Sequence, residues 1–328
     1  METADHTTEE PRKRGLPGHK PGLGGLVRLA LLAIITVFLL LHCHRDKKLD
    51  VLRAAYAFPD SRYMDLDGMP VHYRDVGKGE AILLLHDSNN SLHTWDGWID
   101  SLSATYRTIA VDLPGFGLTG PHPRGSYSTF MYVEFISRFA DSLGLKSFHL
   151  IGNGLGAQIA WVFASEQGTK LKSLVLIDAP GFEQNNNSGV AYLARIPFVN
   201  RLIWSITPRA ALCQMLEDMY ANDSLVTDSL VNRHFDLFLR AGNRKAFTDQ
   251  VQVRDNRPPV KVVEQINVPC LVVWGAEDIR ISPEFAYEFH RLIKGSALKI
   301  YRNAGHWPQQ EIPEKSVGDI LNFLKGRF

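Results

Sequence analysis

The sequence predicts an α/β fold built on a mostly parallel central sheet that helices flank. From about residue 62 onward, short apolar runs with β-branched residues alternate with segments of helical periodicity. Alternation of this kind implies a parallel sheet whose two faces are both covered. The chain has 328 residues, so it can bury a large core, and one α/β domain of ordinary size accounts for most of it.

The expected elements follow one another along this globular part of the chain. Strands are expected at residues 71–76, 81–85, 107–111, 147–151, 174–177, 270–274 and 298–301. Helices are expected at residues 132–143, 156–166, 284–292 and 317–324.

The alternation stops between residues 183 and 265. Three amphipathic helical patterns, at 189–203, 210–220 and 229–239, are separated there by Asn, Pro and Gly. We expect a helical lid insertion over one end of the sheet. The plainer alternative is a second set of packing helices.

The N-terminal region has a different composition. Residues 1–25 are polar and rich in Gly, Pro and charge, which is typical of a disordered tail. Residues 26–43 form an apolar run that approaches the roughly 18–20 residues needed to cross a bilayer as a helix. Residues 44–61 are predicted to be a linker. A buried core helix is disfavoured for 26–43 because a basic segment follows at once.

A cleavable signal peptide is the rival interpretation of residues 26–43. The segment before the apolar run is long, and no A-x-A site follows it promptly. The distribution of basic residues slightly favours a cytoplasmic N-terminus, so we expect a single-pass anchor with the globular domain on the exported side. The basic residues before the run are Arg12, Lys13, Arg14, Lys20 and Arg28, and those after it are Arg45, Lys47 and Lys48.

Composition excludes some function classes. The net charge is +1, so no global field points to nucleic acid. The three cysteines, Cys43, Cys213 and Cys270, are far apart and have neither metal-ligand spacing nor the pattern of a disulfide framework. We expect no metal and no cofactor.

The most informative motif is the segment of residues 152–156, Gly-Asn-Gly-Leu-Gly. It follows an apolar run and precedes a helical stretch, which is the strand–turn–helix context of a G-x-S-x-G nucleophile elbow. The central residue is Gly154 where serine is expected, so covalent catalysis by the usual route is excluded. A dinucleotide-binding loop is disfavoured because no convincing ribose-binding acidic residue accompanies the glycines.

Four further motifs occur in a fixed order around this elbow. Residues 83–86 end a strand at a histidine, and residues 112–117 read D-x-P-G-x-G. Residues 274–278 read W-G-x-x-D, and residues 303–306 end in Gly-His. Together the five motifs resemble the α/β-hydrolase fold family, over residues 62–182 and 266–328, with residues 183–265 as the insertion.

The resemblance implies roles for individual residues. His306 would be the general base, and Asp278 would accept a hydrogen bond from its other ring nitrogen. The oxyanion hole would use the backbone N–H groups of Leu155 and Ser88. Asp87 stands where the family usually has glycine, which permits a tight or left-handed turn. A carboxylate there would oppose a developing oxyanion, so this is a second departure at the same site.

Three functions remain open. The first is a membrane-anchored ester- or amide-type hydrolase with residual chemistry, in which Asp278 and His306 activate water in the space left by the missing serine side chain. The second is a pseudoenzyme that binds a small apolar ligand without turnover, and the third is an anchored scaffold that binds a protein. If only the nucleophile is missing, Gly154→Ser should create or raise esterase activity on a small ester substrate.

Overall fold

The computed structural model describes residues 27–28, 31–32, 36, 44–182, 207–253 and 259–328. The predicted tail at 1–25, most of the predicted anchor at 26–43 and the predicted helix at 189–203 lie outside these ranges. Within the part of the chain that is described, no helix is long and apolar enough to cross a membrane.

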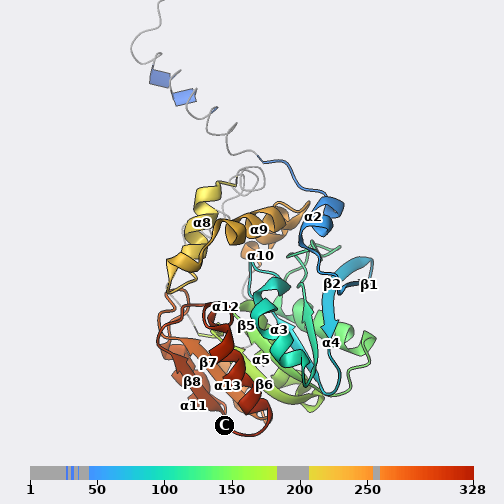
Figure 1. Ribbon diagram of the computed structural model, residues 1–328, viewed down its shortest axis with the longest axis vertical. Helices are drawn as coiled ribbons and strands as arrows, with labels where there is room; N and C mark the ends of the chain where they lie inside the picture. Colours follow the sequence, from blue (N-terminus) through green and yellow to red (C-terminus); the bar gives the residue numbers. More distant parts are fainter. Residues whose placement is uncertain (1–26, 29–30, 33–35, 37–43, 183–206, 254–258) are drawn as a thin grey trace, which may run out of the picture. The chain divides into compact units, whose positions relative to one another are not determined.

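The predicted mostly parallel sheet is confirmed (Figure 1). Its strand order is β1-β2-β4-β3-β5-β6-β7-β8, in which β1 pairs antiparallel with β2, β2 pairs antiparallel with β4, and the other neighbours pair parallel. The strands are β1 Ser61–Leu66, β2 Met69–Val76, β3 Ala81–Leu85, β4 Arg107–Val111, β5 Phe148–Asn153, β6 Leu171–Ile177, β7 Cys270–Gly275 and β8 Ala297–Tyr301.

The helices lie in the connections between strands and in the insertion. The α-helices are α2 Leu49–Tyr56, α3 Asp96–Ser103, α4 Thr129–Ser142, α5 Leu155–Gln167, α8 Arg209–Glu217, α9 Asp228–Phe238, α10 Asn243–Gln252, α11 Glu284–Leu292, α12 Pro308–Glu311 and α13 Pro313–Leu324. The short 3-10 helices are η1 Leu92–Trp95, η2 Gly168–Lys170, η3 Asp223–Leu225 and η4 Val260–Gln265.

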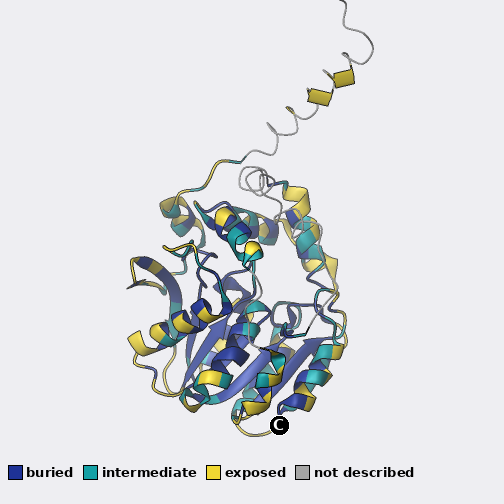
Figure 2. Ribbon diagram, turned by 180° about the vertical axis from the view of Figure 1, so that it is seen from behind, coloured by how far each residue is buried: buried dark blue, intermediate teal, exposed yellow. Residues whose placement is uncertain are grey.

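The sheet separates two hydrophobic cores, because successive side chains of a strand point to opposite faces. In β3, Leu83 and Leu85 pack in the core beneath α4, α5 and α11, whereas Ile82 and Leu84 pack in the core beneath α3 and α13. Figure 2 shows the consequence: the central strands β3, β5 and β7 are buried, whereas the edge strands β1 and β8 are only partly covered.

The segment predicted to be a linker, residues 44–61, is not one. Residues 49–56 form helix α2, and Leu52 is buried against Leu118 and Leu237 of α9. Ahead of it, Lys47 pairs with the backbone of the insertion: its N–H donates to Leu239 O at 2.7 Å, and its carbonyl accepts from Ala241 N at 3.1 Å. The sequence pattern missed this because one short amphipathic helix with a single buried leucine has little periodicity to detect.

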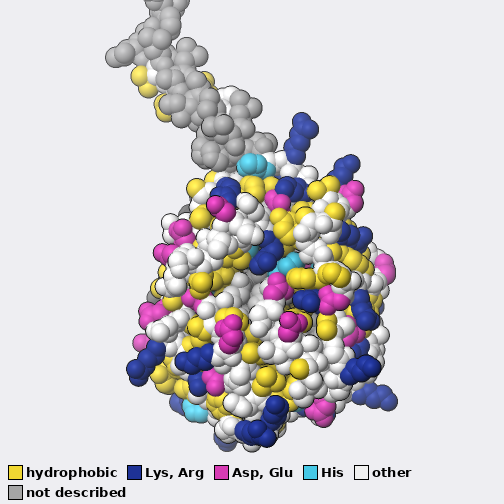
Figure 3. All heavy atoms as spheres, viewed as in Figure 1, with side chains coloured by type: hydrophobic (Ala, Val, Ile, Leu, Met, Phe, Trp, Pro, Cys, Tyr) yellow, Lys and Arg dark blue, Asp and Glu magenta, His cyan; other side chains and the backbone are white. Residues whose placement is uncertain are grey.

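The described helices of the insertion, α8, α9 and α10, gather at one end of the sheet (Figure 1). This is the end to which the carboxyl ends of the parallel strands point, and loops there carry the candidate site residues. Positive and negative side chains are interspersed on the face drawn in Figure 3, in keeping with the net charge of +1.

Candidate active site

The turn from β5 into α5 has the backbone of a nucleophile elbow. Gly154 has φ 53° and ψ −118°, a conformation that glycine adopts without strain. A Cβ atom at Gly156 would lie 2.2 Å from Leu85 O, and one at Gly152 would lie 2.3 Å from the Gly156 backbone. The flanking glycines therefore allow β3, the elbow and α5 to pack closely, although the side chain that the elbow usually presents is absent.

The predicted base and its partner lie together. Asp278, after β7, places Oδ2 2.7 Å from Nδ1 of His306, which lies after β8. The other Asp278 oxygen accepts the backbone N–H groups of Arg280 and Ile281 at 2.7 and 3.0 Å. These bonds fix the carboxylate and, through it, the plane of the imidazole.

The Asp87 carboxylate contacts both the elbow and the histidine, which the sequence did not predict. Its Oδ1 accepts the backbone N–H of Leu155 at 2.8 Å, and its Oδ2 lies 3.1 Å from His306 Nε2 and 3.3 Å from Trp307 Nε1. A Cβ atom at Gly154 would lie 2.0 Å from Asp87 Oδ1. The space expected beside Gly154 for a water molecule is therefore filled by this carboxylate.

The two predicted oxyanion donors also meet at this carboxylate. The N–H groups of Leu155 and Ser88 both lower the pKa of Asp87, so both face its side chain. Asp87 does not adopt the left-handed conformation that a glycine at this position would permit. The left-handed residue of this turn is Asn89, with φ 55°. The two N–H groups that were predicted to bind an oxyanion therefore contact a protein carboxylate.

The buried charged side chains at the site shift one another's pKa values. Burial opposes ionisation of Asp87, but the charge and hydrogen bond of His306, with the two backbone N–H groups, outweigh burial and lower its pKa. Burial likewise opposes the charged form of His306, but Asp278 and Asp87 raise the pKa of His306 well above its ordinary value. Each ring nitrogen faces a carboxylate, and this arrangement favours the imidazolium form of His306, in which both nitrogens donate.

A third carboxyl group stands behind this array. Asp178, after β6, accepts the Gly275 N–H on Oδ1 at 3.0 Å, and its Oδ2 has no hydrogen-bond partner. Burial, and next the charge of Asp278, raise the pKa of Asp178 well above its ordinary value, which favours the neutral form of this carboxyl. Donor atoms of Asp178, Asp278 and His306 lie within 4.8 Å of one another. Asp278 Oδ2 and His306 Nδ1 are already hydrogen-bonded to each other, so these three residues are not an open set of metal ligands.

Two further histidines orient the loops around the site. His86 Nδ1 donates to Asp87 O at 2.6 Å, and Nε2 accepts the Leu113 N–H at 2.9 Å, so the ring is neutral and ties the β3 and β4 loops together. Farther away, His72 joins Ser61 Oγ and Asp112 Oδ2, each at 2.7 Å. Asp112 orients its own loop, as the sequence indicated, by also accepting the Leu118 N–H at 2.7 Å.

The described insertion contacts the site from above. Met219 O accepts the His306 backbone N–H at 2.8 Å, and the ring of His234, from α9, stacks on Trp307 with centroids 5.6 Å apart. His234 Nδ1 also lies 3.1 Å from Asn89 O. As a result His306 is 3% exposed and Asp87 is 4% exposed.

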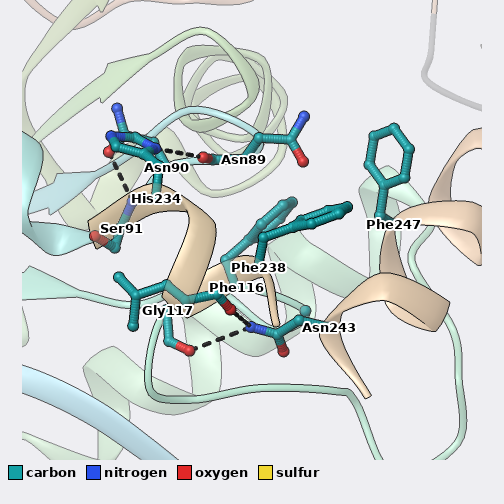
Figure 4. Close-up of a pocket in the computed structure, with 11 residues that line it drawn as sticks. Asn89, Asn90, Ser91, Phe116, Gly117, His234, Phe238, Asn243 and Phe247 are labelled. Carbon is teal, nitrogen blue, oxygen red and sulfur yellow. Dashed lines mark hydrogen bonds between the residues drawn. The ribbon is translucent and has the colours of Figure 1, made fainter. Parts of the chain in front are cut away.

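Beside this contact lies a cavity of about 20 Å³ (Figure 4). Its volume suits one water molecule and is far too small for a substrate. Asn243 donates to Leu237 O at 2.8 Å and to Gly117 O at 3.3 Å, and so joins α9 and α10 to the loop after β4. The lining residues are Asn89, Asn90, Ser91, Gly115, Phe116, Gly117, His234, Leu237, Phe238, Asn243 and Phe247.

Comparison with known proteins identifies relatives for most of the chain. Residues 80–311 match the family described as alpha/beta hydrolase fold. The chain is 27% identical to a 2-hydroxy-6-oxo-2,4-heptadienoate hydrolase of Pseudomonas putida, over 78% of this chain and 93% of that protein. It is 26% identical to epoxide hydrolase 3 of Xenopus tropicalis, over 80% of this chain and 76% of that protein.

A solved structure shows a similar fold. The crystal structure of a membrane phospholipase A, described as a bacterial virulence factor, aligns with a TM-score of 0.70 at 23% identity. The alignment covers 93% of this chain and 98% of that one.

Proposed function

Because this chain belongs to the α/β-hydrolase fold family, we propose that it is a membrane-anchored member that binds a small apolar substrate and acts on it without a serine nucleophile. Relatives with the same fold include hydrolases of different bonds by name, so the fold does not choose the reaction. The choice rests on the chemistry of the site.

One observation carries the proposal: Asp87 Oδ1 accepts the Leu155 N–H at 2.8 Å. This contact places a carboxylate where an ester's developing oxyanion would bind, beside an elbow that has no nucleophile. In addition, Asp87 and Asp278 favour the protonated form of His306, and a protonated imidazole is unable to accept a proton from a nucleophile. Each step of serine catalysis therefore lacks its required group.

The second candidate function is binding without turnover. The position of His306 between two carboxylates favours binding without turnover, because the charges and hydrogen bonds of these three side chains are paired with one another in the absence of a substrate. In this case the small apolar molecule would bind beneath the insertion as a ligand.

The membrane and lid components of the proposal rest on two segments. Residues 26–43 form an apolar run in the sequence and precede residues 44–57. The segment 44–57 contacts α9 through Leu52 and α10 through Arg244, which donates to His44 O at 2.8 Å. We propose that residues 26–43 anchor the chain, with the globular part on the exported side, and that residues 183–265 act as a lid. The contacts of Met219 and His234 with the site support that role.

A fluorophosphonate probe, which captures activated serines, tests the claim that serine catalysis is absent. We expect no labelled serine in the full-length protein in detergent. Ser88 is the residue to check first, because its hydroxyl lies 3.4 Å from Asp87 Oδ1. Labelling that is lost in both Ser88→Ala and His306→Ala would show that a serine mechanism operates after all.

A further inference from the structure

A larger cavity lies away from the site described above. It is bounded by the β1–β2 hairpin, the loop after β4 and helix α4, and its lining residues do not overlap with those of the 20 Å³ cavity. Its volume is about 360 Å³, which falls within the roughly 300–1,000 Å³ typical of small-molecule sites. The cavity is therefore large enough to hold a ligand.

The floor of this cavity is apolar. Leu66 and Met69 come from the hairpin, and Met131 and Phe135 come from α4. Met131 and Phe135 are four residues apart, so they lie on one face of the helix. All four side chains belong to the main hydrophobic core and are at most 8% exposed. An apolar group that rests on this floor leaves water for an apolar surface, which favours binding.

One wall of the cavity is fixed by an ion pair. Asp67, in the turn between β1 and β2, contacts Arg138 of α4 through both carboxylate oxygens. The turn itself is tight, since Asp67 and Gly68 have φ 59° and 79°. The hairpin is thereby held against the helix, and the charges of Asp67 and Arg138 already satisfy each other.

Two other charges at the cavity are free. Arg124, from the loop after β4, and Glu134, from α4, both line it and are both exposed. Among the residues that the structure describes, neither side chain forms an ion pair. Each is close enough to His122 to affect its pKa, so the cation and the carboxylate lie around the same histidine.

His122 adds a hydrogen-bond donor beside Arg124. Burial, and next the charge of Arg124, lower the pKa of His122, although Asp67 and Glu134 partly oppose this. The neutral ring is therefore favoured. Its Nδ1 accepts the Arg124 backbone N–H at 3.3 Å, so Nε2 carries the proton in the neutral form. An anionic group that pairs with Arg124 can accept this second donor.

We propose that this cavity binds a small zwitterion with an apolar body, of the class of an apolar α-amino acid or a short apolar peptide. The carboxylate of the ligand pairs with Arg124 and accepts from His122 Nε2, the ammonium group pairs with Glu134, and the apolar side chain rests on the floor. The inference is independent of the proposed function, because none of these residues belongs to the candidate active site.

The arrangement of charge disfavours other ligand classes. A simple anion would pair with Arg124 but would be repelled by Glu134, and a simple cation would meet the reverse problem. A wholly apolar ligand would remove water from both charges without replacing it. A molecule that carries both charges satisfies both side chains.

The loop after β4 joins this cavity to the insertion. Thr119 O accepts Arg240 Nη2 at 3.0 Å. A Cβ atom at Gly242, just before α10, would lie 2.7 Å from Pro121 Cγ, so the two segments are in close contact. A ligand held by this loop should slow amide exchange within residues 118–127 in the wild type. The Arg124→Gln variant should show no such change.

Saturation-transfer NMR on the full-length protein in detergent tests the ligand class. L-Leucine or L-leucyl-L-leucine should bind with a dissociation constant below about 1 mM, since such ligands have few atoms. N-Acetyl-L-leucine lacks the ammonium group and L-leucinamide lacks the carboxylate, so each should bind at least about 10-fold more weakly than L-leucine. Binding of the dipeptide alone would identify peptides as the source. Binding of neither zwitterion, or equal binding of N-acetyl-L-leucine, would overturn the inference.

Variants locate the ligand in the same measurement. Arg124→Gln and Glu134→Gln should each weaken binding at least about 10-fold. Arg327→Gln and Glu166→Gln are the matched controls, because they remove the same charges from exposed positions outside the cavity, and they should bind as the wild type does. All four changes are at exposed side chains and should leave urea unfolding nearly unchanged. Wild-type affinity in Arg124→Gln and Glu134→Gln would contradict the inference and would leave the fluorophosphonate test of the proposed function unaffected.

Discussion

Asp87 and Gly154 are two departures from the family's pattern that depend on each other. Each departs from the pattern of the family, and each accounts for the other, because the Asp87 carboxylate requires a residue without a side chain at 154. Neither residue alone converts a serine site into the observed one. Glycine alone would leave an empty elbow, and aspartate alone would collide with the serine.

The buried charges make stability depend on pH. The pKa of Asp87 is lowered from 3.8 by folding. Ionised Asp87 therefore adds to the free energy of unfolding above that pH, and this stabilisation is lost as the pH falls through the folded-state pKa. The pKa of His306 is raised from 6.5 by folding. Protonated His306 therefore adds fully to the free energy of unfolding below that pH, and this stabilisation is lost as the pH rises through the folded-state pKa. Both contributions are present together between pH 3.8 and 6.5.

Asp87→Asn should therefore lower the free energy of unfolding most in that interval, by about 3–5 kcal/mol, because it leaves a buried charge with one partner fewer. Urea unfolding at about pH 5 and about pH 9 measures the difference, which should shrink at the higher pH. The exposed Asp100→Asn serves as control and should change little. An equal loss at both pH values would argue against the charged pair.

The sequence indicated which residues lie at the site, but it did not predict that the Asp87 carboxylate fills the space beside Gly154. The turns that carry His306, Asp278, Leu155 and Ser88 follow from periodicity and punctuation, and the resemblance to the α/β-hydrolase fold family selected these residues within the turns. The role of Asp87 could not, because the direction of a loop side chain depends on which space its neighbours leave empty. The prediction that Gly154→Ser restores activity assumed an empty site, and the carboxylate beside Gly154 removes that assumption.

At the scale of elements, the strands of the parallel core and the helices α4, α5, α11 and α13 could be predicted, with ends shifted by a few residues, whereas α3 at Asp96–Ser103 was missed. The elements that were missed lie at edges or pack in short contacts. Strand β1 is an edge strand with a mostly exposed pattern, and α2 and α10 each bury few apolar side chains. Short amphipathic segments of this kind are defined by tertiary contacts more than by local pattern.

Helix α2 should stabilise the insertion through Leu52, which is 1% exposed against Leu118 and Leu237. Leu52→Ala should lower stability by about 2–5 kcal/mol and should raise amide exchange in α9. Val51→Ala, on the same helix but 57% exposed, is the matched control and should change neither quantity. Exchange in α9 that is the same in both variants would mean that α2 does not brace the insertion.

At the scale of the whole molecule, the chain divides into residues Met1–His42 and Cys43–Phe328, and all the described core lies in the second part. We expect the full chain to sediment with membranes and the fragment Cys43–Phe328 to remain in the supernatant. The fragment must begin before Lys47, because that residue pairs with Leu239 and Ala241. A full chain recovered entirely from the supernatant would refute the proposed anchor.

The central claim is that one carboxylate has taken the place of the serine and fills the oxyanion hole. The most direct test is p-nitrophenyl butyrate hydrolysis by the wild type, Gly154→Ser, Asp87→Gly and the double variant Gly154→Ser/Asp87→Gly. The account predicts activity only in the double variant, at least on the order of 100-fold above Gly154→Ser, because only there are the nucleophile and the oxyanion donors both free. Gly154→Ser alone as active as the double variant would contradict the account, since Asp87 would then obstruct nothing.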